Sequence, residues 1–424
     1  MLERSGTRTL TVGLLALGLA LALGAGPGPA PAAPAGGAAR PEGVKTRKAR
    51  PGFLTARERA RLQKEEWEKA ARGEHPKSQP QEVPGDGPSA TMPPMAPGAA
   101  IRFVLTGDVA LNWRGTSTDL RIFHWRRNPL RFFAPVFKAA DLAVANMETV
   151  LADQDPKYAQ ERLNLWAPVA SGQIFRPAGI GLLTTANNHA FDARDRGVLE
   201  TLGHLRRTGV EVMGTGATLA EARRPYTFLK GPSCVAFVPG TTKCNLPVRG
   251  KAHLAFYPEK REGELIALVK ETKERCAFVI VVIHWGVEMK HFPHPSMKRL
   301  AHELVDAGAD LVVGHHPHVL QGVEYRGKGA IVYSLGNFVF SNPNEATRRT
   351  GALVVELSGG AKPSLVRLSM IPAYIHRNDY IVRPAAPSRA ADIQRRMASY
   401  SQPFGTQVVL TGGVLQFTRG KPED

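Results

Sequence analysis

The chain has 424 residues, which is enough for two or three domains at about 150 residues per domain. Its composition of 43% hydrophobic and 22% charged residues excludes global disorder, a collagen, a coiled coil and a multi-span membrane protein. The net charge of +18 favours an anionic partner, such as a polyanionic polymer, a phosphate ester, an acidic lipid or a nucleic acid. No recognition motif for nucleic acid accompanies this charge, so we expect no nucleic-acid partner.

The first 25 residues have the order of a secretory signal. Arg4 and Arg8 precede an apolar run over residues 11–25, and small residues follow it. The run is shorter than the roughly 20 residues that a membrane-spanning helix needs. We therefore predict a signal peptide over residues 1–25, with an uncleaved membrane anchor as the alternative. Either way the protein is expected to be exported to the periplasm or cell envelope, and to lie near the membrane if the anchor is retained.

Residues 26–98 are predicted to form a disordered linker, because proline removes backbone donors and glycine resists ordering. Within the linker a charged helix is expected near residues 54–75, where strong helix formers carry opposite charges at helical spacing. The globular domain is predicted to cover residues 99–424.

The three cysteines are too few for a disulfide scaffold, and none forms a CxxC motif. In an oxidising compartment Cys234 and Cys244 are expected to pair across a short loop, which leaves Cys276 in a buried strand. Three inert thiols are the alternative interpretation.

From residue 101 onward, short apolar runs alternate with amphipathic segments. Strands are predicted at 101–105, 142–145, 180–185, 210–213, 235–238, 277–286, 309–318, 330–340, 351–359 and 364–375, and helices at 197–207, 265–274 and 296–307. The alternation favours an α/β sandwich. Residues 385–424, with a helix-like segment at 388–400 and a strand-like segment at 406–418, are interpreted as a covering element of the same domain.

Polar side chains gather just beyond the ends of the predicted strands. These residues are Asp108, Asn146, Glu148, Asn188, His189, His284, His315, His316 and His318. The carboxyl ends of strands in an open α/β sheet form the edge at which ligands bind. Carboxylate, amide and imidazole groups together suit one or two divalent ions, namely Mn²⁺, Fe²⁺ or Zn²⁺.

Two ions about 3.5–4 Å apart could hold a phosphoryl group and activate water. Such a pair needs a bridging carboxylate, for which Glu148 is the candidate. The remaining predicted ligands are Asp108, Asn188, His284, His316 and His318. His189 is predicted to act as the general acid toward the leaving group, with Asp192 orienting its ring. The three histidines at 315, 316 and 318 can be placed in the motif in two registers, so His315 stays open as a ligand. Asn337 is expected to hold a turn.

Six ordered blocks carry a resemblance to a known family: "LTGDVALN", "ANMETVL", "TTANNHAFDARDRGVLETL", "VVIHWGVEM", "DAGADLVVGHHPHVLQGVE" and "IVYSLGNFVF". Over about residues 101–342 the chain resembles the CapA proteins of capsule or poly-gamma-glutamate synthesis, which look like a branch of the calcineurin-like metallophosphoesterases. The resemblance implies a two-sheet sandwich flanked by helices. It also matches Asp108, Glu148, Asn188, His189, His284, His316 and His318 to the metallophosphoesterase motifs.

One departure from that pattern affects the metal site. The larger superfamily has Asp-x-His at its first motif, whereas Val109 and Ala110 follow Asp108 here. Two hypotheses follow: an exported metal-dependent hydrolase acting on a phosphoester or related bond in envelope polymer metabolism, or a catalytically silent metal-binding component of a capsule export or anchoring complex. The expected partners are an anionic envelope polymer or phosphoester substrate and a capsule synthesis or export complex.

Overall fold

The computed structural model describes residues 88–111, 128–152, 165–248, 250–342, 344–377 and 379–420. The predicted signal peptide at 1–25, the charged helix near 54–75 and most of the 26–98 linker lie outside these residues. Within the described ranges, no helix combines the length and the apolar character that a membrane span requires.

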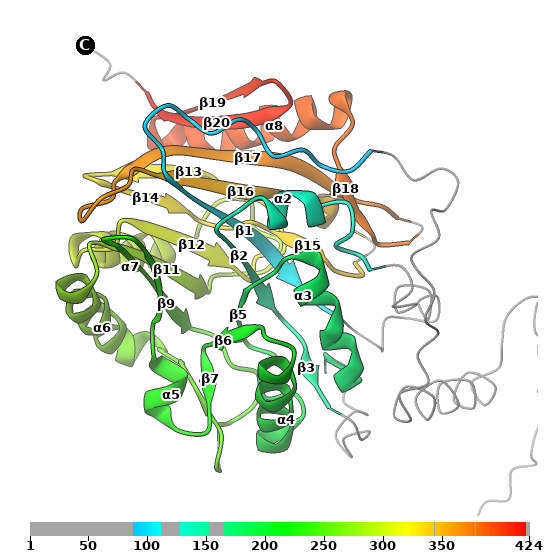
Figure 1. The fold of residues 1–424 in the computed structure, drawn as a ribbon, viewed down its shortest axis with the longest axis vertical. Coiled ribbons are helices and arrows are strands. Elements are labelled where there is room, and N and C mark those ends of the chain that lie inside the picture. The colour runs from blue at the N-terminus through cyan, green and yellow to red at the C-terminus, as the bar shows by residue number, and fades with distance from the viewer. Residues whose placement is uncertain are drawn as a thin grey trace, which may run out of the picture. The chain divides into compact units, whose positions relative to one another are not determined.

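A 10-stranded mixed sheet forms one layer of the described region (Figure 1). Its main path runs β19 (Thr406–Thr411), β20 (Val414–Arg419), β17 (Leu365–Ile375), β16 (Arg349–Leu357), β1 (Ile101–Val109), β2 (Leu142–Met147), β5 (Leu182–Thr184) and β6 (Glu211–Met213). Two strands join beside this path: β15 (Asn337–Val339) pairs with β1, and β18 (Val382–Pro384) pairs with β17. Strands β1, β2, β5 and β6 are parallel, so their carboxyl ends share one edge.

A 6-stranded sheet forms the second layer. Its order is β13 (Val323–Arg326), β14 (Gly329–Val332), β12 (Leu311–His315), β11 (Phe278–His284), β9 (Ser233–Thr241) and β8 (Tyr226–Lys230). All seven residues of β11 are buried between its parallel neighbours β9 and β12. An unbroken β-branched run is what a parallel strand covered on both faces requires, and β11 has one.

The two sheets pack face to face through one apolar core. Phe103, Val144 and Leu182 of the first sheet share that cluster with Phe237 and Val282 of the second. Burial of such side chains is worth roughly 25 cal/mol per Å² of apolar surface, so this layer holds the sheets together. The predicted two-sheet α/β sandwich is confirmed.

Helices cover the outer face of each sheet. On the first sheet lie α2 (Ala134–Lys138) and α3 (Phe175–Ala178), and on the second lie α6 (Glu262–Arg275) and α7 (Pro295–Asp306), as Figure 1 shows. Helix α7 begins with a proline in its first turn, buries residues at helical spacing and ends before Gly308, whose φ is +114°. Two further helices are α4 (Arg194–Arg207), which connects β5 to β6, and α5 (Leu219–Arg223), which precedes β8.

The remaining described elements are short. The two-stranded pairs are β3 (Val150–Leu151) with β4 (Trp166–Ala167), and β7 (Thr215–Gly216) with β10 (His253–Leu254). The 3-10 helices are η2 (Val169–Ile174), η3 (Glu259–Arg261), η4 (Glu345–Arg348) and η5 (Gln402–Phe404).

The C-terminal segment covers the sandwich, as interpreted from the sequence. Helix α8 (Pro387–Ser401) buries Ile393 and Met397 in the core between the sheets. The single strand-like segment expected at 406–418 is instead the hairpin β19–β20. Gly412 and Gly413 close its turn with φ of +58° and +77°, values that side chains with a Cβ rarely adopt.

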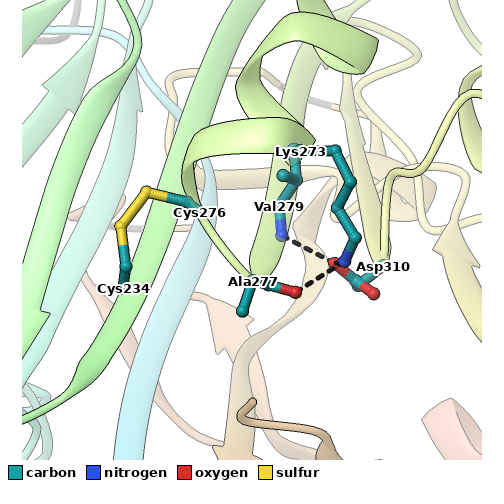
Figure 2. The surroundings of a disulfide bond; sticks show 6 residues. All are labelled: Cys234, Lys273, Cys276, Ala277, Val279 and Asp310. Atoms are coloured by element: carbon teal, nitrogen blue, oxygen red, sulfur yellow. Dashed lines mark hydrogen bonds and ion pairs between the residues drawn. A yellow bond between two sulfur atoms is a disulfide. The ribbon is translucent and has the colours of Figure 1, made fainter. Parts of the chain in front are cut away.

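The predicted cysteine pairing is wrong. The disulfide joins Cys234 to Cys276, and Cys244 is free (Figure 2). Cys276 also lies just after α6, not within a strand. The reason is the parallel register of β9 and β11, in which Val235 is opposite Phe278. That register brings Cys234, the second residue of β9, beside Cys276, which lies two residues before β11 begins.

Candidate metal centre

The carboxyl ends of strands from both sheets meet at one place in the sandwich. Asp108 lies near the end of β1, Glu148 directly follows β2, and Asn188 follows β5. From the second sheet, His284 is the last residue of β11, and His316 and His318 follow β12. All six side chains are buried. The structure therefore brings together every residue that the sequence proposed as a metal ligand.

The first group of donor atoms centres on His284. Its Nε2 lies 2.8 Å from Asn188 Oδ1, 3.1 Å from His316 Nδ1 and 3.7 Å from Glu148 Oε1. Glu148, His284 and His316 thus offer ligand atoms close enough to hold one metal ion. Four lone-pair atoms that converge in this way match the donor set of a divalent transition metal.

A second group of donor atoms also includes Glu148. Asp108, Glu148 and His318 also offer ligand atoms close enough to hold an ion. His318 Nδ1 lies 3.3 Å from Asp108 Oδ2, and His318 Nε2 lies 3.8 Å from Glu148 Oε1. Glu148 is common to both groups, as a bridging carboxylate would be.

Glu148 is fully buried, and neither of its carboxylate oxygens has a hydrogen-bond partner among the described residues. A buried carboxylate that accepts no hydrogen bond costs several kcal/mol when it is ionised. Burial accordingly raises the pKa of Glu148 well above its ordinary value of 4.5. A divalent cation would remove that penalty, so the residues present fit a metal.

The pKa values of the three histidine ligands are also shifted by their surroundings. Burial lowers the pKa of His284 well below 6.5, and it lowers the pKa of His316 to about 3. Burial also opposes the charge on His318, but Glu148 and Asp108 outweigh it and raise the pKa of His318 to about 10. Neutral imidazoles at His284 and His316 are in the state that binds metal, whereas His318 must release its proton to do so.

The loop after β12 carries His316 and His318, and both residues have an uncommon backbone conformation. His316 and His318 have φ of +95° and +58°, in the left-handed region that non-glycine residues rarely occupy. Strain of this kind costs about 1–3 kcal/mol per residue and concentrates at functional sites. The sequence left open whether His315 is a ligand. In the structure its Nε2 bonds the carbonyl of Thr106, and His315 belongs to neither group of donors.

His189 lies at the edge of the centre rather than within a group of donors. Its Nδ1 donates to Asp192 Oδ2 at 2.6 Å, and its Nε2 lies 3.9 Å from Glu148 Oε1. The same Asp192 oxygen accepts the backbone N–H of Leu165. Asp192 thereby fixes the ring, and Nε2 faces the centre.

Three asparagines support the centre in roles that the sequence did not reveal: Asn146 was noted only as a polar residue at a strand end, Asn337 was expected to hold a turn, and Asn187 was not singled out. Asn146 donates to Asp108 Oδ1 at 2.7 Å, and Asn187 donates to Asn146 Oδ1 and to the carbonyl of Met147. Asn337 accepts from His318 Nδ1 at 2.8 Å, so it orients a ring and does more than hold a turn. Their position beside strand ends was the available signal. Such partners fix ligand orientation and usually matter almost as much as the ligands.

A loop after β9 forms a wall beside His189. Asn245 accepts from Asn188 Nδ2 at 3.3 Å, and its backbone N–H donates to the carbonyl of Asn188. Asn245 also lines a cavity of about 540 Å³ whose other walls are mostly apolar, among them Leu246, Leu254 and Phe256. This cavity adjoins the centre through Asn245.

The fold and the centre define a class: a two-sheet α/β sandwich with a carboxylate, amide and imidazole cluster at the strand ends. The family model described as "Bacterial capsule synthesis protein PGA_cap" matches residues 102–342. The chain belongs to this family.

Curated relatives agree with the family assignment. The chain is 30% identical over 255 residues to the "PGA biosynthesis protein CapA" of Bacillus subtilis (strain 168), which covers 58% of this chain and 64% of the relative. It is 31% identical over 220 residues to the "Capsule biosynthesis protein CapA" of Bacillus anthracis, covering 50% and 53%. The chain thus matches less than two thirds of the length of either relative.

A solved structure titled "Putative 5'-Nucleotidase from Staphylococcus aureus in complex with alpha-ketoglutarate" aligns with a TM-score of 0.40. The identity is 13%, and the alignment covers 70% of this chain and 58% of that one. A likeness this remote supports no inference about function.

Proposed function

We propose that the protein is an exported, metal-dependent hydrolase that acts on a phosphoester or a related bond in the metabolism of an envelope polymer. The observation that carries the proposal is Glu148, a fully buried carboxylate that has no hydrogen-bond partner among the described residues and that belongs to two groups of metal donors. The family assignment supplies the polymer context, namely capsule synthesis.

The proposed ligands fall into two sets that share Glu148. Asn188, His284 and His316 would hold one divalent ion, and Asp108 and His318 would hold the other. When bound, such ions polarise a phosphoryl oxygen and supply an activated water nucleophile. The protein's own part is to hold these ligands rigidly at the strand ends and to exclude competing water.

His189 is proposed as the group that protonates the leaving oxygen. Its Nε2 faces the centre while Asp192 holds Nδ1, so one proton can be delivered from a fixed direction. Positioned proton transfer of this kind contributes roughly 10²–10⁴ in rate.

Export is supported by the disulfide between Cys234 and Cys276, because such bonds persist in oxidising compartments and are rare in the cytosol. The net charge of +18 favours an anionic polymer or phosphoester as substrate. The names of the relatives refer to PGA and capsule biosynthesis, and we propose that this chain works within a capsule synthesis or export complex.

A second candidate function is a catalytically silent metal-binding component of such a complex. Ala110 favours it, because it stands where the larger superfamily has a ligating histidine and offers no donor atom. An assay of the full chain on a chromogenic phosphodiester with Mn²⁺ separates the two candidates. Metal uptake without turnover on a broad phosphoester panel with Mn²⁺, Fe²⁺ and Zn²⁺ would favour the silent component.

The acid role of His189 gives a sharper test. His189→Ala should leave metal content near normal and lower the rate by roughly 10²–10⁴. The deficit should shrink for substrates with good leaving groups, which need little protonation. Equal deficits for good and poor leaving groups would refute the acid role. His318→Ala serves as the contrasting variant, because it should lose metal and activity together.

A further inference from the structure

The donor set around Asp108 is the poorer of the two. Asp108, Glu148 and His318 offer three side chains, whereas Asn188 adds a fourth to the group around His284. Ala110 is buried two residues after Asp108 and has no donor atom. An ion beside Asp108 therefore needs a further ligand from elsewhere in the chain.

Glu288 lies where it can supply that ligand. One of its carboxylate oxygens and the ring nitrogens of His316 and His318 all lie within 4.8 Å of one another. Glu288 is exposed, in contrast to the buried ligands. It therefore approaches His318 from the solvent side of the centre.

The backbone fixes Glu288 in this place. The loop that carries it follows β11 and is hydrogen-bonded to the loop of His316 and His318 on both sides of Glu288. Trp285 N donates to the carbonyl of His315 at 3.0 Å, and Met289 N donates to the carbonyl of Pro317 at 2.9 Å. A third bond joins Gln321 Nε2 to the carbonyl of Lys290 at 2.7 Å. These bonds hold the backbone that carries Glu288 beside the loop of the two histidines.

We propose that Glu288 is an additional ligand of the metal centre, which it reaches beside His316 and His318, and that it supplies a donor atom where Ala110 offers none. This inference rests on the proposed metal centre. A third carboxylate makes the site harder, so it should favour Mn²⁺ or Fe²⁺ more than an imidazole in the same place would.

The test is the binding of Mn²⁺ to the full chain, followed by calorimetry and by elemental analysis after dialysis. Glu288→Gln keeps the shape of the side chain but removes the anionic donor. It should weaken one Mn²⁺ site by about tenfold or more, the scale on which even outer partners of a metal site act, and leave the other site unchanged. Glu271→Gln is the matched control, because it makes the same charge change on the exposed part of α6 and should bind Mn²⁺ as the wild type does.

A further variant separates ligation from charge. Glu288→His restores a donor atom without a negative charge, so it should recover binding of one ion and shift its preference toward Zn²⁺. If Glu288→His binds as weakly as Glu288→Gln, the effect is electrostatic and the ligand assignment is wrong. A Glu288→Gln isotherm that superposes on that of the wild type also overturns it. If the wild type takes up no metal, the proposed centre fails together with the role of Glu288.

Discussion

Two fully buried glutamates in this protein have opposite surroundings. Glu356 in β16 accepts from Arg102 Nε and Nη2 at 3.0 and 2.6 Å and from the backbone N–H of Ala96, and its other oxygen accepts from Arg367. Glu148 accepts no hydrogen bond from the described residues, and the groups nearest its Oε1 are histidine nitrogens of the centre at 3.7 to 3.9 Å. Where the protein needs the charge only for its own fold, it supplies the compensation itself. At Glu148 the compensation is left to a ligand.

The largest expected effect is the loss of the Glu356 cluster. Glu356→Gln leaves the buried Arg102 and the partly buried Arg367 without their counter-charge, so the free energy of unfolding should fall by about 3–5 kcal/mol. Urea denaturation measures this change. A loss below about 1 kcal/mol would contradict the structural role given to Glu356.

Metal should stabilise the protein through Glu148 and not through Glu356. At a free Mn²⁺ concentration of 100 times the dissociation constant, the wild type should gain about 2.7 kcal/mol of stability. Glu148→Ala should remove most of that gain, while Glu356→Gln should retain it from its lower starting point. Thermal unfolding with and without Mn²⁺, and after treatment with a chelator, measures both. A full gain in Glu148→Ala would show that this carboxylate is not the bridge.

Without metal, Glu148→Gln should change stability by less than about 1 kcal/mol, unlike the same substitution at Glu356. Burial already penalises the ionised form of Glu148 and raises its pKa, so an uncharged amide of the same shape loses little. The comparison uses urea denaturation of the chelated proteins at neutral pH. A loss as large as that of Glu356→Gln would mean that Glu148 belongs to an internal ion pair.

The smallest change in stability is expected at an exposed carboxylate. Glu271 pairs with Arg275 on the surface of α6, where solvent screens the pair. Glu271→Gln should therefore change the free energy of unfolding by less than about 0.5 kcal/mol, with or without Mn²⁺. A larger effect would mean that the loss at Glu356 cannot be assigned to burial alone.

The sequence predicted the strand ends and the ligand candidates because both depend on local patterns. Apolar runs of strand length stop at Asp108, Glu148 and His284, and parallel strands bring such stops to one edge. The spacing of His316 and His318 likewise needed no knowledge of distant contacts. These features could be predicted because each is encoded within a few residues.

Features that depend on long-range register could not be predicted. The partner of Cys234 is 42 residues away and is chosen by the pairing of β9 with β11. Asn337 meets His318 because β15 pairs with β1 beside Asp108. Glu288 gave no signal because it is an exposed acidic residue in a loop, and only the hydrogen bonds of that loop place it beside the histidines.

The disulfide also has a consequence for the chain when it is not folded. It closes a covalent ring between Cys234 and Cys276, and that ring contains the whole wall loop that carries Asn245. Closing a ring of this size removes conformational freedom from the denatured ensemble that amounts to about 4 kcal/mol in the chain-entropy model. In the oxidised, unfolded chain the loop that carries Asn245 is therefore tethered at both ends. Fewer conformations of this loop have to be sampled before Asn245 meets Asn188.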